Sequence, residues 1–104
     1  MKMAVRTRNP AEMPMKCRVL QLLAEKGPMW DYEIWGILSR EYGISGEYWK
    51  GVVKLLLIEL ASGGLTSSIE HSLDDGSHFG KDVVLYKYQI EDFGRLRARQ
   101  VCML

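Results

Sequence analysis

The chain has 104 residues, of which 47% are hydrophobic and 26% are charged, and its formal net charge is +1. This length favours one domain with one core, and the charged fraction is ordinary for a soluble protein. No apolar run approaches the roughly 20 residues that span a bilayer, and no apolar segment of the secretory type follows the basic N-terminus. We therefore expect a cytoplasmic protein with no membrane partner.

The charges are distributed unevenly along the chain. Basic residues cluster near the two ends, whereas the middle carries most of the acids. The basic residues are Lys2, Arg6, Arg8, Lys16 and Arg18 at one end and Arg95, Arg97 and Arg99 at the other. If both ends reach one surface, that surface is basic and suits a nucleic acid. Residues 1–12, broken at Asn9-Pro10, are interpreted as a flexible arm, whose Arg6 and Arg8 are candidates for phosphate contact; the alternative is a disordered tail.

The two cysteines, Cys17 and Cys102, lie far apart and outside any CxxC pattern. Their number and spacing exclude a cysteine-based zinc site and argue against a disulfide framework. We interpret them as buried thiols that act as small hydrophobic side chains. A crosslink between the chain ends, or a redox switch, is the alternative.

The first half of the sequence predicts three helices. Apolar residues at three- and four-residue steps predict a helix over about 13–26, which Gly27 and Pro28 would end. Residues 29–30 suit a very short strand. Asp31 is the expected N-cap of a second helix over about 32–42. A short connection through residues 42–45 then leads to a third helix over about 46–61, as in a helix-turn-helix.

The third helix is apolar all round at its middle. Its expected core residues are Trp49, Val52, Val53, Leu56, Leu57 and Leu60. Leu55 and Ile58 add apolar surface on the other side, so we expect the helix to be buried on more than one side. The arm, the last helix or a second subunit would supply the extra cover.

From Leu65 the hydrophobic period changes to two, which predicts a β-hairpin. Leu65, Ile69 and Leu73 are expected on one face of its first strand. Residues 74–81 form the tip, in which Asp74 and Asp75 should be solvated, and residues 82–90 form the return strand. His71 and His78 lie near these acids, but the spacing matches no recognised metal site and the composition is that of a turn. A last helix is predicted over about 92–101.

Three runs of this sequence resemble PadR-like winged-helix regulators. Residues 19–34 (VLQLLAEKGPMWDYEI) resemble that family's leucine-rich helix, Gly-Pro and Gly-Tyr-Glu-Ile step. Residues 60–65 (LASGGL) resemble its exit from the third helix, and residues 88–95 (YQIEDFGR) resemble its Tyr-x-Leu-Thr-x-x-Gly-Arg signature. Asp31 replaces a usual glycine, Glu91 replaces a usual threonine, and the hairpin lacks the usual basic residues.

The resemblance implies an α+β winged helix-turn-helix over residues 13–104: a three-helix bundle, a two-stranded wing and a C-terminal helix. PadR-like proteins dimerise through terminal helices, so a homodimer is expected. The candidate interface residues are Phe93, Leu96, Val101 and Leu104.

In a helix-turn-helix the first residues of the second motif helix approach the base edges of duplex DNA. The candidates in this helix are Glu47, Tyr48, Lys50, Gly51 and Lys54. The lysines suit phosphate or guanine, Glu47 suits cytosine, and Gly51 allows close approach. On the wing, His78 and Lys81 are candidates for phosphate contact. The alternative is that these charges form a solvated helix face.

We therefore expect a sequence-specific, double-stranded DNA-binding transcriptional regulator. The alternative is a winged-helix protein-protein interaction module, which the near-neutral charge and acidic wing also suit. No catalytic constellation, phosphate loop or metal-ligand spacing is recognisable, so neither an enzyme nor a cofactor is expected. A single asparagine, Asn9, fits a thermophilic source.

Overall fold

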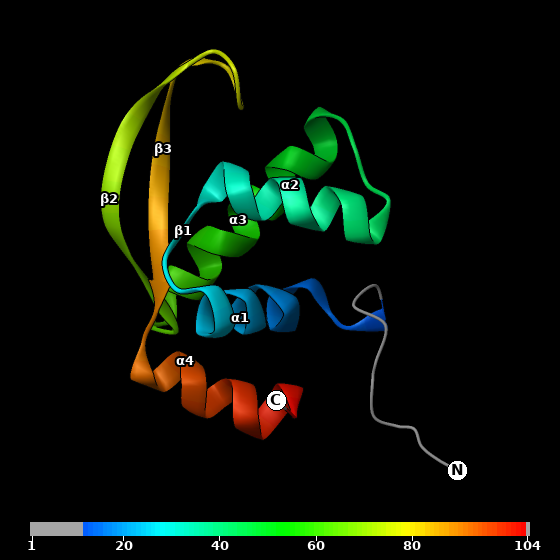
Figure 1. The fold of residues 1–104 in the computed structure, drawn as a ribbon, viewed down its shortest axis with the longest axis vertical. Coiled ribbons are helices and arrows are strands. Elements are labelled where there is room, and N and C mark those ends of the chain that lie inside the picture. The colour runs from blue at the N-terminus through cyan, green and yellow to red at the C-terminus, as the bar shows by residue number, and fades with distance from the viewer. Residues whose placement is uncertain (1–11, 104) are drawn as a thin grey trace.

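The computed structural model describes residues 12–103 (Figure 1). The arm, with Arg6 and Arg8, and the terminal Leu104 lie outside the described residues. The element order is α1 (Met15–Lys26), β1 (Met29–Trp30), α2 (Asp31–Tyr42), α3 (Glu47–Ser62), β2 (Thr66–Asp75), β3 (Lys81–Ile90), α4 (Asp92–Arg97) and a π-helical turn (Ala98–Cys102). Each predicted helix and strand is present, with its ends shifted by a few residues.

Helix α1 lies at the centre of the core. Its buried side chains pack with α2, α3, β3 and the C-terminal helix. Most of the fully buried side chains of the core come from α1, α2 and α3: Val19, Leu20, Leu22, Leu23, Ile34, Leu38 and Val53. A two-point ion pair joins α1 to α2, because Nε and Nη2 of Arg18 donate to the two oxygens of Glu41 at 2.8 and 2.7 Å. This contact lowers the pKa of Glu41 through the hydrogen bond from Arg18. The helical bundle is therefore stabilised by apolar packing and by the ion pair between α1 and α2.

The three strands form one antiparallel sheet in the order β1-β3-β2. The short strand predicted at residues 29–30 is confirmed, since Met29 pairs with Tyr88 and Trp30 with Lys87. Beyond that pairing, β2 and β3 extend as a two-stranded ribbon past the helices (Figure 1). The ribbon is the wing of the fold.

The predicted facing of β2 is wrong. Thr66 is buried, whereas Ile69 and Leu73 are exposed. The register shifts between Ser68 and Glu70, and such a bulge changes which side chains face the helices. The outer half of the strand also extends beyond the helical core, so an apolar residue there has no core to enter.

The helix-turn-helix connection follows the sequence pattern. Gly43 ends α2 in the left-handed conformation, with φ 65° and ψ 37°. Gly46, with φ 93°, is the N-cap of α3. Asp31 is the first residue of α2 and does not cap it as predicted: its Oδ2 accepts from the backbone N–H of Tyr86 in β3 at 3.1 Å. The carboxylate therefore connects the helix to the sheet.

Helix α4 approaches the start of β2 so closely that its third residue must be glycine. A Cβ on Gly94 would lie 2.1 Å from the carbonyl oxygen of Leu65 and 2.9 Å from Cγ1 of Ile90. This contact gives a physical reason for the glycine in the run that resembles the PadR signature. The predicted single helix over 92–101 instead changes to a π-helical turn at Ala98.

Cys17 and Cys102 form a disulfide, with their Cα atoms 5.6 Å apart. The interpretation as free buried thiols is wrong, and the alternative of a crosslink between the chain ends is correct. The C-terminal helix packs along α1 (Figure 1), which brings together two residues separated by 85 positions. The spacing of the two cysteines in the sequence does not predict that they come together.

Three helices, a three-stranded antiparallel sheet and a β2–β3 wing define a winged helix with an added C-terminal helix. The predicted α+β fold class is thereby confirmed. Within residues 12–103 no helix is long and apolar enough to cross a bilayer.

Candidate nucleic-acid interface

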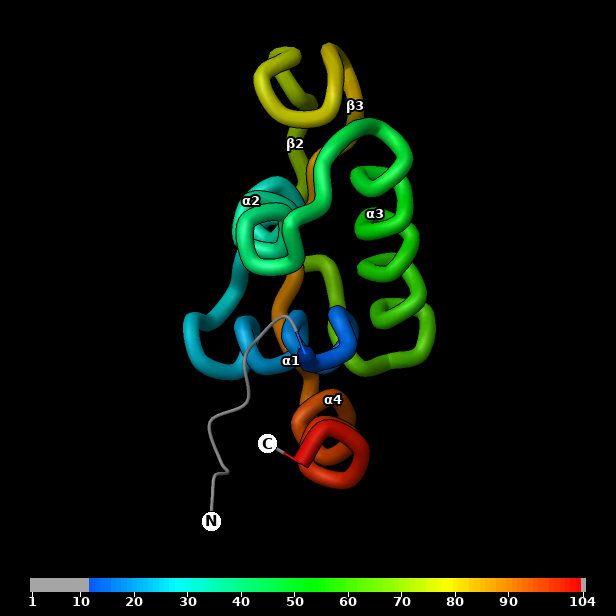
Figure 2. Tube along the Cα trace, turned by 90° about the vertical axis from the view of Figure 1, so that its right-hand side faces the viewer, coloured from blue at the N-terminus to red at the C-terminus, as the bar shows by residue number. Residues whose placement is uncertain are grey.

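The wing tip and the first half of α3 lie at the same end of the molecule (Figure 2). One direct contact joins them: Nζ of Lys54 lies 4.9 Å from the ring centroid of Phe79, a cation-π geometry. The helix and the wing therefore present one composite surface. In winged-helix proteins that bind DNA, such a helix enters a groove while flanking elements hold the backbone.

Asp74 organises the wing tip from inside. Its side chain is only 2% exposed, so the expectation that it is solvated is wrong. Oδ1 accepts from the backbone N–H groups of Gly76 and His78, and Oδ2 accepts from those of Phe79 and Gly80. Desolvation opposes ionisation, but these four hydrogen bonds outweigh it and hold the pKa of Asp74 far below its usual range. The tip is thus a preformed loop built around a buried carboxylate.

The tip is also docked on the start of α2. The ring of His78 stacks on that of Tyr32, with centroids 3.7 Å apart and planes 14° from parallel. Tyr32 in turn stacks against Trp30 at 6.0 Å. The expected phosphate candidate His78 is therefore half-buried in an aromatic stack, while Lys81, at the start of β3, is exposed.

The start of α3 carries both charges and an exposed aromatic side chain. Nζ of Lys50 lies 3.3 Å from Oε2 of Glu47, so these two candidates are paired with each other. Tyr48 is 75% exposed and meets Trp49 edge-on at 5.4 Å. Around Gly51 there is open space, with no atom within 4 Å of a built Cβ. Glu47, Lys50 and Gly51 lie on one side of the helix, with Tyr48 beside them, and Glu47, Tyr48 and Gly51 are exposed in this chain.

Behind Lys54 lies a small cavity of about 30 Å³, lined also by Asp31, Leu57, Ile58, Tyr86 and Tyr88. Asp31 is 3% exposed, and its Oδ1 has no hydrogen-bond partner among the described residues. Burial raises the pKa of Asp31, and hydrogen bonds from backbone N–H groups oppose that shift. Desolvation also raises the pKa of Tyr88 to about 12. Sequence reasoning missed this cluster because its members come from α2, α3 and β3.

The basic residues of the C-terminal helix do not lie near the wing tip or the start of α3. Arg95, Arg97 and Arg99 belong to α4 and the turn after it, at the end of the molecule opposite the wing tip (Figure 1). They therefore do not join Lys50, Lys54 and Lys81 on one surface. Lys16, from the N-terminal basic cluster, lines one pocket with Arg97, so described residues of the two clusters do come together, but on a different surface from Lys50, Lys54 and Lys81.

Two apolar surfaces remain uncovered in the described part of the chain. Leu55 and Ile58 on α3 are 56% and 49% exposed, so the last helix, one of the three expected sources of cover, does not bury them. On the C-terminal helix, Phe93, Leu96 and Val101 are also exposed. Among residues 12–103, no group of three or more His, Cys, Asp or Glu side chains is placed to hold a metal ion.

Comparison with known proteins found a solved structure with a similar fold. No family model and no curated protein matches the sequence. The structure is similar to the crystal structure of the putative transcriptional regulator TA0346 from Thermoplasma acidophilum, with a TM-score of 0.61 and 22% identity. The match covers 83% of this chain and 74% of that one. At this identity the likeness supports the winged-helix fold and leaves the PadR-like resemblance as an expectation.

Proposed function

We propose that this chain is a sequence-specific regulator of transcription that binds double-stranded DNA through α3 and the wing. One observation carries the proposal: the free face of α3 and a preformed wing tip lie together at one end, joined by the Lys54–Phe79 contact. A preordered tip binds with little loss of conformational entropy. The likeness to TA0346, which is described as a putative transcriptional regulator, adds support.

In this proposal α3 enters the major groove with its first turns. Lys50 and Lys54 meet phosphates or guanine acceptors, and Glu47 meets a cytosine amino group. The Glu47–Lys50 pair must open for both contacts to form, and such an exposed pair is worth less than about 1 kcal/mol. Tyr48 packs on sugar or a thymine methyl, and Gly51 allows the helix backbone to come close.

The wing supports the complex from the flank. Lys81 contacts phosphate, and His78 contacts it from within the aromatic stack with Tyr32. Arg6 and Arg8 add phosphate contacts from the arm. The wing contributes less charge than the helix, because Asp75 and Asp82 flank Lys81 on the exposed part of the tip.

The C-terminal helix pairs two subunits. Phe93, Leu96, Val101 and Leu104 supply the interface, and three of these side chains are exposed in the single chain. A symmetric dimer would place two α3 helices on half-sites about one helical turn, or a multiple of it, apart.

The test is a fluorescence-anisotropy titration of duplex DNA with the Lys50→Ala/Lys54→Ala variant. Loss of two cations from the interface should weaken binding at least about tenfold and reduce its salt dependence. The matched control is Lys26→Ala/Arg99→Ala, which removes the same charge away from the tip and should bind as the unmodified chain does. Equal affinity of the first variant and the unmodified chain would contradict the proposed position of α3.

A second candidate function rests on Leu55 and Ile58. Two large exposed apolar side chains on the presumed DNA face are unusual for a phosphate-contacting surface and suit a protein partner. A Leu55→Ser/Ile58→Ser variant that binds DNA normally but loses a protein partner would favour a protein-protein interaction module. A variant that loses DNA binding would favour the regulator.

A further inference from the structure

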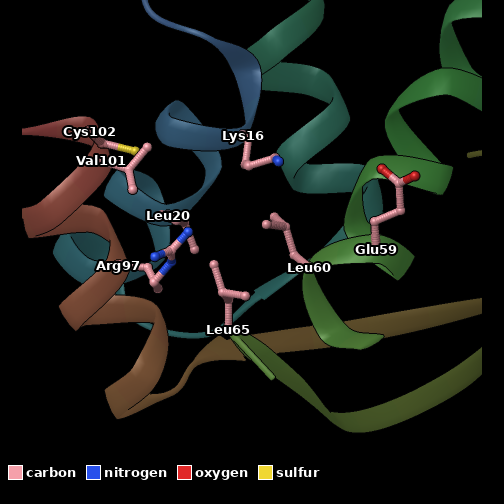
Figure 3. Close-up of a pocket in the computed structure, with 8 residues that line it drawn as sticks. All are labelled: Lys16, Leu20, Glu59, Leu60, Leu65, Arg97, Val101 and Cys102. Carbon is pink, nitrogen blue, oxygen red and sulfur yellow. The ribbon is translucent and has the colours of Figure 1, made fainter. Parts of the chain in front are cut away.

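A pocket of about 180 Å³, drawn in close-up in Figure 3, is lined by residues of α1 and the C-terminal helix, which lie at the end of the molecule opposite the wing tip (Figure 1). It lies between α1, the last turns of α3, the start of β2 and the C-terminal helix. Its apolar lining consists of Leu20, Leu60, Leu65 and Val101. An engineered apolar cavity of about 150 Å³ holds benzene, so this pocket has room for a ligand of roughly that size.

Two cations line the same pocket. Lys16 projects from α1 and Arg97 from α4, and both side chains appear beside the apolar lining in Figure 3. The ion pairs among residues 12–103 involve other side chains, which leaves these two cations without a carboxylate within 4 Å in that part of the chain. Glu59 also lines the pocket, on the side away from Arg97 (Figure 3). The pocket therefore has an apolar floor, with Arg97 and Glu59 on opposite sides and Lys16 between them (Figure 3).

We propose that this pocket binds a small amphipathic monoanion, with an apolar tail on the leucines and a carboxylate held by Lys16 and Arg97. A guanidinium binds a carboxylate through two parallel hydrogen bonds, and an ammonium adds a point charge. Glu59 repels a second negative charge, so a monoanion is favoured over a dianion. This inference goes beyond the proposed function and does not depend on DNA binding.

The disulfide lies beside the pocket and joins the two segments that carry the cations. Cys102 lines the pocket, and its bond to Cys17 joins the C-terminal helix to α1. These two segments carry Arg97 and Lys16, respectively. Reduction of the disulfide should loosen one wall against the other and weaken ligand binding.

The probe is hexanoate, titrated into the isotopically labelled full chain and followed by amide chemical shifts. We expect saturable shifts centred on the pocket residues, with 1-hexanol binding at least about fivefold more weakly and hexylamine not binding, because only the carboxylate meets the cations. Binding of 1-hexanol as tight as that of hexanoate would overturn the proposal. So would the absence of saturable shifts, or shifts centred elsewhere.

Paired variants distinguish hexanoate binding in this pocket from a general effect of the charge of the chain. Lys16→Ala and Arg97→Ala should each weaken hexanoate binding about five- to tenfold, because each removes one charged group at an exposed site. Lys26→Ala and Arg99→Ala remove the same charges from the same segments but outside the pocket, and should bind as before. Equal losses in the variants and their controls would overturn the proposal, whatever the DNA titration shows.

Discussion

His78 at the tip of the wing stacks on Tyr32 at the start of α2, with ring centroids 3.7 Å apart. This contact, together with Lys54 over Phe79, holds the tip of a long two-stranded ribbon against the helices. A free ribbon of two strands is marginal in water, so its outer half depends on such contacts. The position of the wing tip relative to α2 and α3 therefore depends on a few aromatic side chains.

Removal of the stack should release the wing tip. Tyr32→Ala removes the ring under His78, and an aromatic pair contributes about 0.5–1.5 kcal/mol. We expect a small loss in the free energy of unfolding and a clear loss of hydrogen-exchange protection in residues 76–80. Tyr48→Ala removes an exposed ring that does not contact the tip and should leave that protection unchanged. Equal protection in both variants would show that the stack does not hold the tip.

The tip should remain ordered in acid because of Asp74. The fold lowers the pKa of this carboxyl, so its stabilising effect is complete above about pH 4, the usual pKa of aspartate, and is lost as the pH falls through the lower value. Amide resonances of Phe79 and Gly80 should therefore keep their positions well below pH 4. Asp74→Asn, which lacks the charge, should shift them at neutral pH. Movement of these resonances already near pH 4 would contradict the buried-carboxylate arrangement.

Two glycines should respond oppositely to alanine. Gly94→Ala forces a methyl group against the carbonyl of Leu65 and should lower the free energy of unfolding by about 1–3 kcal/mol. Gly51→Ala meets no atom within 4 Å and should raise it by up to about 1 kcal/mol, because alanine favours a helix. Urea denaturation measures both. If Gly51→Ala also weakens DNA binding, the helix backbone approaches the groove at that position as proposed.

Loss of the disulfide should destabilise the whole fold. Its two cysteines are 85 positions apart, and a crosslink over a long loop typically contributes about 2–4 kcal/mol by restricting the unfolded chain. The Cys17→Ser/Cys102→Ser variant should unfold at a correspondingly lower urea concentration. Treatment of the unmodified chain with a reductant should give the same shift, and the variant should not respond to it. A reductant that leaves the unmodified chain unchanged would indicate that the bond contributes little.

Most of the fold could be predicted from the sequence, because local sequence patterns determine most of its helices and strands. Periods of 3.6 and 2, with glycines at the ends of elements, placed the helices and the hairpin. The expectation for the short strand at Met29 was also correct, although a two-residue strand exists only through its pairing with Tyr88. These features depend on neighbours along the chain or on the one sheet that the hairpin predicts.

The errors share a physical cause, which is contact between distant residues. Asp31 bonds to Tyr86, 55 positions away, and a capping rule cannot anticipate that partner. The approach of Cys102 to Cys17 depends on the angle at which the last helix leaves the sheet. Asp74 looked solvated because turns usually expose aspartate, yet here the loop folds around it. Candidate residues on α3 could be proposed from its position in the motif, whereas the docked tip and the cavity beside Asp31 depend on contacts between segments that are distant in the sequence.

The most direct test of the account is the binding of labelled duplex DNA to the unmodified chain at low and at moderate salt, measured by fluorescence anisotropy. A surface that contacts phosphates through Lys50, Lys54 and Lys81 releases counterions, so the affinity should fall steeply as salt rises. The absence of binding even at low salt would contradict the regulator proposal and leave the apolar face of α3 as a site for a protein partner.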